Sequence, residues 1–210
     1  MWYRFIAFDV DGTLLNSAYA DSLALQQTLR EELDMHLSRE EIRGLLGLPG
    51  EVVLCRLGVP EAQYARITRL WTRRLGEYAA LMALFPGVRE MLAALWESGA
   101  LLGVVTSKNA QEYAQDVPPL GITQYFHAAV TAGETRRGKP EPDPLLECMR
   151  RVGAKPEETL YIGDTPYDRD CARGAGADFA LATWGSATPD MEGATWYLRR
   201  PEDILDILGQ

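Results

Sequence analysis

The most informative stretch of the chain is Phe5-Ile6-Ala7-Phe8-Asp9-Val10-Asp11-Gly12-Thr13, in which an apolar run meets two carboxylates. The run covers residues 5–8 and stops at Asp9. A strand buried on both faces of a parallel sheet has this continuous apolar character, and Gly12 then interrupts it. The stretch therefore predicts a buried strand that ends in a pair of acidic side chains.

Short apolar runs alternate with helical patterns through the C-terminal half. Strands are expected at Leu101 to Val105, Ala128 to Val130, Thr159 to Ile162 and Asp178 to Ala182. Helices are expected at residues 87–98, 142–152 and 168–175. Strands that alternate with helices imply right-handed crossovers and a parallel sheet covered on both faces. This part of the chain predicts an α/β fold.

Residues 17–82 have a different character. Leucines recur at helical spacing in Leu23, Leu25, Leu29 and Leu33, and again around Trp71. The only strand-like run is the ambiguous Val52-Val53-Leu54. We therefore expect a helical insert at 17–82 within a core formed by 1–16 and 83–210.

Composition narrows the class of protein. The 210 residues are 47% hydrophobic and carry 21 basic and 30 acidic side chains, a formal charge of −9. An acidic surface repels nucleic acid and anionic membranes, so neither is an expected partner. No apolar run reaches the length of a membrane span, and no signal peptide is expected at the start. Three widely spaced cysteines fit a reducing cytoplasm.

Four polar clusters follow the apolar runs or lie in loops. They are Asp9/Asp11, Thr106/Ser107/Lys108, Lys139 and Asp164/Asp168. Ligands of open parallel sheets bind beyond the carboxyl ends of the strands. If the strands are adjacent, the clusters converge on one edge of the sheet.

The chemistry of these side chains favours a metal and a phosphate. Asp9 and Asp11 would repel each other without a counter-charge, and oxygen ligands of this kind suit Mg²⁺. Asp164 supplies a further carboxylate. A metal also solves the repulsion between an acidic protein and a phosphate substrate.

The same residues divide the work of a phosphoryl transfer. Asp9 can attack phosphorus as a nucleophile, and Asp11 can act as general acid and then general base. Thr106 or Ser107 can position the phosphoryl group, and Lys139 can neutralise Asp9 and the transferring charge. Asp168 can support the metal site or cap the following helix.

These clusters resemble, in order, the four motifs of the haloacid dehalogenase superfamily. The matching segments are Asp9-Val10-Asp11-Gly12-Thr13, Val104-Val105-Thr106-Ser107-Lys108, Lys139-Pro140 and Gly163-Asp164-Thr165-Pro166-Tyr167-Asp168. The resemblance implies a Rossmann-like core with an inserted α-helical cap domain at 17–82. About 30 residues separate the second and third motifs, too few for the alternative α/β cap. The helical-cap subclass contains the phosphoglycolate phosphatases.

The resemblance also implies particular ligands. Mg²⁺ would be held by Asp9, the backbone carbonyl of Asp11 and Asp164. Gly12, Thr13, Ser107 and Lys108 would contact the phosphate. Among the arginines of the insert, we expect Arg43 to bind a second anionic group of the substrate. Gly44 to Gly50 predicts a loop next to it that can approach the site.

Absences narrow the choice within the superfamily. Haloacid dehalogenases lack an acid/base aspartate two residues after the nucleophile, whereas Asp11 is present here. Phosphonatases and β-phosphoglucomutases use a lysine of the cap, but the first lysine of this chain is Lys108. The mutases also carry a histidine where this chain has Asp21. Hydrolysis of a phosphate monoester is what remains.

We therefore expect a cytoplasmic Mg²⁺-dependent phosphatase that forms an aspartyl phosphate. Its partner is a small phosphorylated metabolite, and the chain is a monomer or homodimer. Phosphoglycolate is the substrate implied by resemblance; pyrophosphate, a nucleotide or a sugar phosphate remain alternatives. Two other classes stay open: a non-catalytic phosphate-binding regulator on the same fold, and an interaction module built on 17–82.

Overall fold

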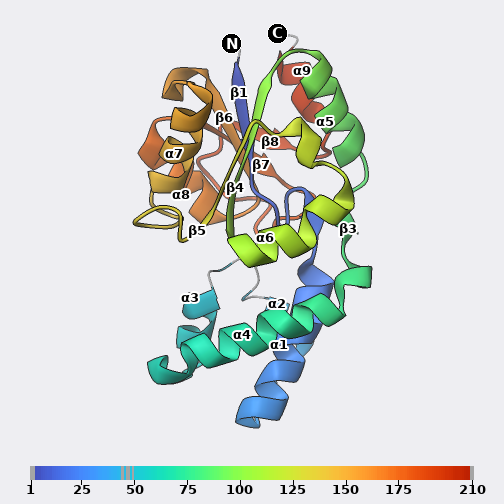
Figure 1. Ribbon diagram of the computed structural model, residues 1–210, viewed down its shortest axis with the longest axis vertical. Coiled ribbons are helices and arrows are strands. Elements are labelled where there is room, and N and C mark those ends of the chain that lie inside the picture. Colours follow the sequence, from blue (N-terminus) through green and yellow to red (C-terminus); the bar gives the residue numbers. More distant parts are fainter. Residues whose placement is uncertain (1–2, 44, 46–47, 49, 209–210) are drawn as a thin grey trace. The chain divides into compact units, whose positions relative to one another are not determined.

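The computed structural model describes residues 3–43, 45, 48 and 50–208, without the side chains of Arg39 and Arg43 (Figure 1). The chain forms two compact units. Met1–Leu15 and Leu84–Gln210 form the first, here called the sheet unit, and Asn16–Ala83 forms the second, here called the helical unit.

Six strands make up the central sheet of the sheet unit. They are β1 (Phe5–Phe8), β4 (Leu101–Asn109), β5 (Ala128–Ala132), β6 (Thr159–Gly163), β7 (Asp178–Ala182) and β8 (Trp196–Leu198). Their order across the sheet is β5-β4-β1-β6-β7-β8, and each neighbouring pair is parallel. The expected Rossmann-like α/β fold is confirmed.

Helices cover both faces of this sheet, as Figure 1 shows for α7 (Asp143–Val152) and α8 (Pro166–Ala175) on one side and α5 (Val88–Glu97) and α9 (Asp203–Leu208) on the other. All four residues of β1 have no exposed surface. A strand covered on both faces must be apolar throughout, which explains the run at residues 5–8.

Three elements of the sheet unit were not predicted. The edge strand β8 is short, and its Tyr197 is half exposed. The helix α6 (Ala110–Asp116) has no buried residue and so lacks the apolar periodicity that identifies a helix. It is held at its start by a capping box, in which Asn109 and Glu112 satisfy each other's backbone groups. The short helix α9 was the third element missed.

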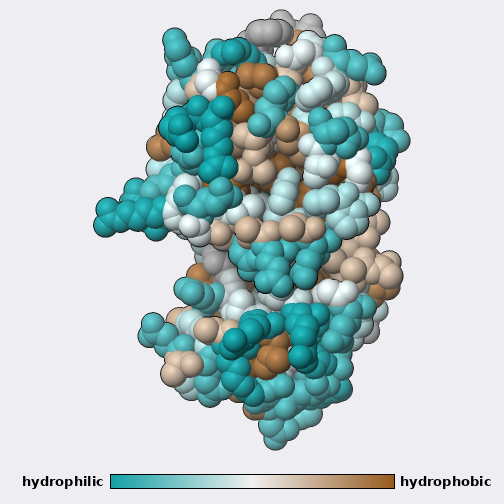
Figure 2. All heavy atoms as spheres, viewed as in Figure 1, coloured by the Kyte–Doolittle hydropathy of each residue, from teal (hydrophilic) through white to brown (hydrophobic). Residues whose placement is uncertain are grey.

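The described residues of the helical unit contain four α-helices: α1 (Ala18–Leu33), α2 (Arg39–Arg43), α3 (Gly50–Arg56) and α4 (Tyr64–Glu77). Their shared core contains Ala24, Leu25, Leu29, Ile42, Val53, Leu54, Val59, Ile67 and Trp71. The ambiguous run Val52-Val53-Leu54 lies in α3, because burial of two of its side chains outweighs the weak strand preference of valine. Hydrophilic residues dominate the outward side of α4 (Figure 2).

Short segments complete the chain. The 3₁₀ turns are Glu61–Gln63, Ala79–Leu81, Pro118–Leu120, Thr123–Tyr125 and Pro156–Glu158. The strands β2 (Leu15–Asn16) and β3 (Ala83–Leu84) pair with each other where the chain passes between the units. Among the described residues, the helices are too short or too polar to cross a membrane.

Candidate active site

The ends of three adjacent strands bring the first polar residues together. β1 lies between β4 and β6, with Phe8 opposite Val104 on one side and Ile162 on the other. The amide of Asp9 donates a hydrogen bond to the carbonyl oxygen of Ile162 at 2.9 Å. Asp9 therefore lies at the same sheet edge as Thr106, which follows in β4, and Asp164, which follows β6. The expected convergence of strand ends is present.

Lys139 joins this edge from the loop after β5. Its Nζ lies 2.9 Å from Oδ1 of Asp9 and 2.7 Å from Oδ1 of Asp168. The Lys139 side chain is 4% exposed, and that of Asp168 is completely buried. The ammonium group thus bridges two carboxylates from separate segments in a region sheltered from water.

Asp168 is held by more than the lysine. The hydroxyl of Tyr161 in β6 lies 2.9 Å from its Oδ1 and equally close to the carbonyl oxygen of Val105. Thr165 donates to its Oδ2 from both backbone amide (3.0 Å) and hydroxyl (2.6 Å). Asp168 therefore completes the capping box of α8, whose N-cap residue is Thr165, and also anchors Lys139. Tyr161 was not singled out from the sequence, because an aromatic residue within an apolar run predicts packing alone.

Burial changes the proton affinity of these groups. Loss of solvent raises the pKa of Asp9 to about 7, although Lys139 opposes the change. The pKa of Asp164 is raised well above its ordinary value by burial first and then by the negative charges of Asp168 and Asp9. Burial alone would lower the pKa of Lys139, but its two carboxylate neighbours raise it above the usual range. The site holds more negative charge than its own residues can balance.

The donor set fits a divalent cation. Among the described residues, Asp9, Asp164 and Asp168 each offer an oxygen within 4.8 Å of the others, and all three are buried. Three carboxylates face one ammonium group, and both oxygens of Asp168 already accept hydrogen bonds. Asp9 and Asp164 are therefore the pair with oxygen atoms to give to a metal. Carboxylate oxygens of this kind suit Mg²⁺.

The turn after Asp9 is shaped around Asp164. Gly12 has a φ of +79°, and a Cβ atom there would lie 2.2 Å from Oδ2 of Asp164. The hydroxyl of Thr13 donates to Oδ1 of Asp164 at 3.3 Å. Gly12 thus allows the close approach of the two loops. The buried hydroxyl of Thr13 is turned to the carboxylate of Asp164.

A second loop, residues 184–186 after β7, ties these turns together. The indole nitrogen of Trp184 donates to the backbone carbonyl oxygen of Thr13 at 3.0 Å. The hydroxyl of Ser186 donates to the backbone carbonyl oxygen of Asp164 at 2.6 Å. A Cβ atom at Gly185 would lie 1.8 Å from the carbonyl oxygen of Gly12. This loop was not predicted as part of the site. Its position after a parallel strand was the available signal, because such loops share the same sheet edge.

The end of β4 supplies polar groups of two kinds. Thr106 is buried, and its Oγ1 accepts a hydrogen bond from the backbone amide of Lys108 at 3.1 Å. Ser107 is exposed, and Asn109 caps α6. Thr106 and Ser107 therefore lie in the strand next to β1, just before the capped helix α6, where backbone amides and hydroxyl groups can bind phosphate oxygens.

Lys108 occupies an unexpected position. Its Nζ lies 2.7 Å from Oδ2 of Asp116, at the end of α6, and 3.2 Å from Oδ2 of Asp11. Burial by itself would lower the pKa of Lys108, but Asp11 and Asp116 raise it. We had expected this lysine to contact phosphate, whereas its ammonium group lies between two carboxylates. Asp116 was not singled out from the sequence.

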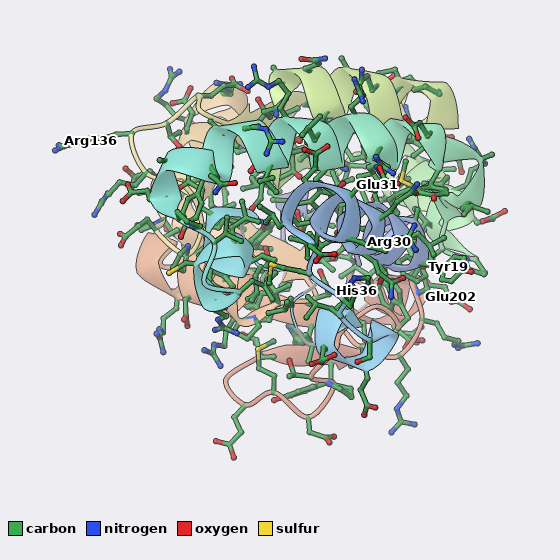
Figure 3. All side chains as sticks on the ribbon, turned by 90° about the horizontal axis from the view of Figure 1, so that it is seen from below. Tyr19, Arg30, Glu31, His36, Arg136 and Glu202 are labelled. Carbon is green, nitrogen blue, oxygen red and sulfur yellow. The ribbon has the colours of Figure 1, made fainter. Side chains whose placement is uncertain are left out.

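Two arginines need separate mention. The side chain of Arg43 is not among those described, so its expected contact with substrate stays a prediction. Arg136, in the loop that leads to Lys139, points outward from the fold (Figure 3). Its charge is exposed to solvent.

Comparison with known proteins agrees with this geometry. Residues 6–182 match the family model described as haloacid dehalogenase-like hydrolase. The phosphoglycolate phosphatase of Escherichia coli K12 is 31% identical, over 98% of this chain and 92% of its own length. The N-acetylmuramic acid 6-phosphate phosphatase of Pseudomonas aeruginosa is 28% identical, over 99% and 96%.

A solved structure from Lactobacillus plantarum, described as a candidate phosphoglycolate phosphatase, superposes with a TM-score of 0.94 at 26% identity. The match covers 99% of this chain and all of that one. The family model spans most of the sequence and includes the strand ends that carry Asp9, Thr106 and Asp164 and the loop that carries Lys139. The chain therefore belongs to the haloacid dehalogenase-like hydrolase family.

Proposed function

We propose that this protein is a Mg²⁺-dependent phosphatase that hydrolyses a small organic phosphate monoester through an aspartyl phosphate on Asp9. The phosphatase class is supported by the family and by relatives named as phosphatases. The observation that carries the proposal is the buried carboxylate of Asp9, 2.9 Å from the ammonium group of Lys139 and within metal-sharing reach of Asp164.

The first half of the reaction uses both aspartates of the first loop. An oxygen of Asp9 attacks phosphorus, the bond between phosphorus and the leaving oxygen breaks, and Asp11 gives its proton to that oxygen. The Asp11 side chain is 37% exposed, far more than the 9% of Asp9. A general acid must be accessible to the leaving group, whereas a buried nucleophile is protected from solvation by water.

The second half restores the enzyme. Asp11, now ionised, removes a proton from water, and the water oxygen attacks phosphorus to release inorganic phosphate and free Asp9. Lys139 stays protonated and balances the charge of Asp9 throughout. Mg²⁺ would be held by the carboxylates of Asp9 and Asp164 and by the backbone carbonyl oxygen of Asp11. When bound, the metal neutralises negative charge on the phosphoryl oxygens.

The phosphate cradle is assigned to groups that surround Asp9. Thr106 and Ser107 supply hydroxyl groups and amides. The backbone amides of Gly12 and Thr13 already donate to the carbonyl oxygens of Leu15 and Val10, so these two residues shape the turn beneath the phosphate. Asp168 supports Lys139 without touching the substrate. The helical unit takes the part of a cap, whose expected role in such an enzyme is to exclude water during the reaction.

The substrate assigned here is of the phosphoglycolate type, a short carboxylate-bearing phosphate ester. A sugar phosphate is the second candidate, because a relative named for a sugar 6-phosphate matches almost the full length of both chains. The protein is assigned to the cytoplasm, which suits its three free cysteines.

A substrate panel tests this proposal. Phosphoglycolate, sugar 6-phosphates, nucleotides, pyrophosphate and p-nitrophenyl phosphate are assayed with Mg²⁺ and with EDTA. We expect metal-dependent release of phosphate that is lost in Asp9→Asn. Binding of phosphate esters without turnover across the whole panel would instead favour a non-catalytic regulator.

A further inference from the structure

Lys108 and Asp116 form a sheltered ion pair beside Asp11. Their side chains are 7% and 9% exposed, and the Nζ to Oδ2 distance is 2.7 Å. The same Nζ lies 3.2 Å from Oδ2 of Asp11, whose side chain is 37% exposed. The buried pair thus reaches one partly exposed carboxylate.

The backbone makes this pair rigid. Lys108 lies within β4, one residue before Asn109, whose side chain accepts hydrogen bonds from the amides of Gln111 and Glu112. Glu112 returns a bond by accepting from the Asn109 amide at 2.8 Å. This reciprocal cap fixes the start of α6, and Asp116 is the last residue of that helix. Both ends of the ion pair are therefore set by regular structure.

The contacts of Lys108 argue against a direct role in phosphate binding. Its ammonium group already lies against two carboxylates, and turning it to a phosphate would leave Asp116 in a buried setting without its cation. A charge anchored in this way is suited to orient the more exposed member of the cluster.

We propose that Lys108, anchored by Asp116, is the positioning residue of the Asp11 carboxyl group and thereby governs proton delivery to the leaving oxygen. The inference rests on the proposed function and assigns Lys108 to the leaving-group side of the reaction. Lys108 keeps its own proton. The proton that reaches the leaving oxygen comes from Asp11, while the new bond forms between Asp9 and phosphorus.

The nature of the leaving group separates this role from others. An alkyl phosphate releases a strongly basic alkoxide unless it is protonated, whereas p-nitrophenyl phosphate releases a stabilised phenolate. Misplacing Asp11 should therefore slow the first substrate far more than the second. Loss of a phosphate-binding lysine, or general damage to the fold, would slow both alike. The ratio kcat/KM reports this first step, since it excludes later hydrolysis of the phosphoenzyme.

The test compares the two substrates in one set of variants of the full chain. Lys108→Met combined with Asp116→Asn removes both charges together, so no unpaired buried charge remains to unfold the protein. Lys108→Arg keeps the cation, and Asp11→Asn gives the reference pattern. Lys155→Met and Asp206→Asn remove one exposed lysine and one exposed aspartate outside the active site as matched controls.

In the double variant, kcat/KM for the alkyl phosphate should fall at least about tenfold, and that for p-nitrophenyl phosphate by less than about threefold, the selectivity expected when general acid catalysis is impaired. Lys108→Arg should recover most of the loss. Equal losses on both substrates, with the wild type active, would overturn this inference alone. A wild type inactive on every phosphate would overturn the proposed function and the inference with it.

Discussion

The ammonium group of Lys139 lies 2.9 Å from Oδ1 of Asp9, and a second carboxylate, that of Asp168, holds the same group at 2.7 Å. The lysine reaches Asp9 from a loop, and Asp168 reaches the lysine from the first turn of α8. Asp168 thus holds Lys139 in place, and Lys139 in turn orients Asp9. This chain of contacts explains why Asp168 belongs to the site without an oxygen free for the metal.

Replacing Lys139 with methionine should damage both stability and activity. The change leaves Asp9 and Asp168 buried without their cation, and breaking such a pair costs about 3–5 kcal/mol. Loss of charge stabilisation should also lower kcat by about 10²-fold or more. Urea denaturation and steady-state kinetics measure the two effects. Lys155→Met, at an exposed site, should change neither, and a stable, active Lys139→Met enzyme would contradict the assignment.

A methyl group at Gly185 should disturb the turn at Gly12, which follows Asp9 and Asp11. The new Cβ atom would meet the carbonyl oxygen of Gly12 at 1.8 Å, and backbone on both sides cannot turn away as a flexible side chain can. We expect Gly185→Ala to cost about 1–3 kcal/mol, the usual penalty for overpacking, and to lower kcat/KM.

Gly76→Ala serves as the matched control for that variant. A Cβ atom at this helical position meets no other atom within 4 Å, so the change should be neutral or slightly stabilising. Thermal melts of both variants give the comparison. Equal melting temperatures would show that the loop of residues 184–186 does not constrain Gly12.

Stability of the metal-free protein should fall as the pH rises toward about 7. Burial raises the pKa of Asp9 from its ordinary value to about 7, so the folded state keeps a proton that the unfolded chain has released. A folded state that binds more protons loses stability with rising pH until its own pKa is passed. Asp164, whose pKa is also raised, acts in the same direction.

Mg²⁺ should offset this loss, because it binds the ionised carboxylates. The increase in melting temperature at a fixed Mg²⁺ concentration should therefore be larger at about pH 8 than at about pH 6. Differential scanning fluorimetry with and without the metal measures it. In Asp9→Asn the increase should shrink at both pH values. An increase that does not depend on pH would remove Asp9 from the metal site.

Removing the hydroxyl group of Tyr161 should weaken the support of Lys139 without removing any charge. Tyr161→Phe leaves the carbonyl oxygen of Val105 and Oδ1 of Asp168 each short of one neighbour. A lost buried hydrogen bond costs about 1–3 kcal/mol. We expect that loss in chemical denaturation, with a smaller fall in kcat than Lys139→Met shows. Tyr197→Phe, at a half-exposed site, should cost less; equal costs would indicate that the Tyr161 hydroxyl has no special role.

The parallel sheet and the convergence of its strand ends could be predicted from the sequence. The run at residues 5–8 is apolar because β1 is covered on both faces, and Asp9 and Asp164 follow strands that prove to be neighbours. Strand type and strand ends are local properties. Once the strands are parallel and adjacent, the positions of the carboxylates follow.

Other parts depend on contacts between distant residues and could not be predicted in this way. Val52-Val53-Leu54 is helical because the helical unit buries it, a property absent from the run itself. Lys108 contacts Asp116 because Asn109 caps α6, a helix without the apolar periodicity that would reveal it in the sequence. Gly185 approaches Gly12 across 172 intervening residues, a contact visible only after folding.

Trapping the phosphoenzyme tests the central claim most directly. Asp11→Asn should slow hydrolysis of the intermediate, so acid quenching during turnover of p-nitrophenyl phosphate with Mg²⁺ should capture protein that carries one phosphoryl group. Peptide mass spectrometry should locate that group on Asp9, and Asp9→Asn should carry none. A phosphoryl group on another residue, or full activity in Asp9→Asn, would contradict the account.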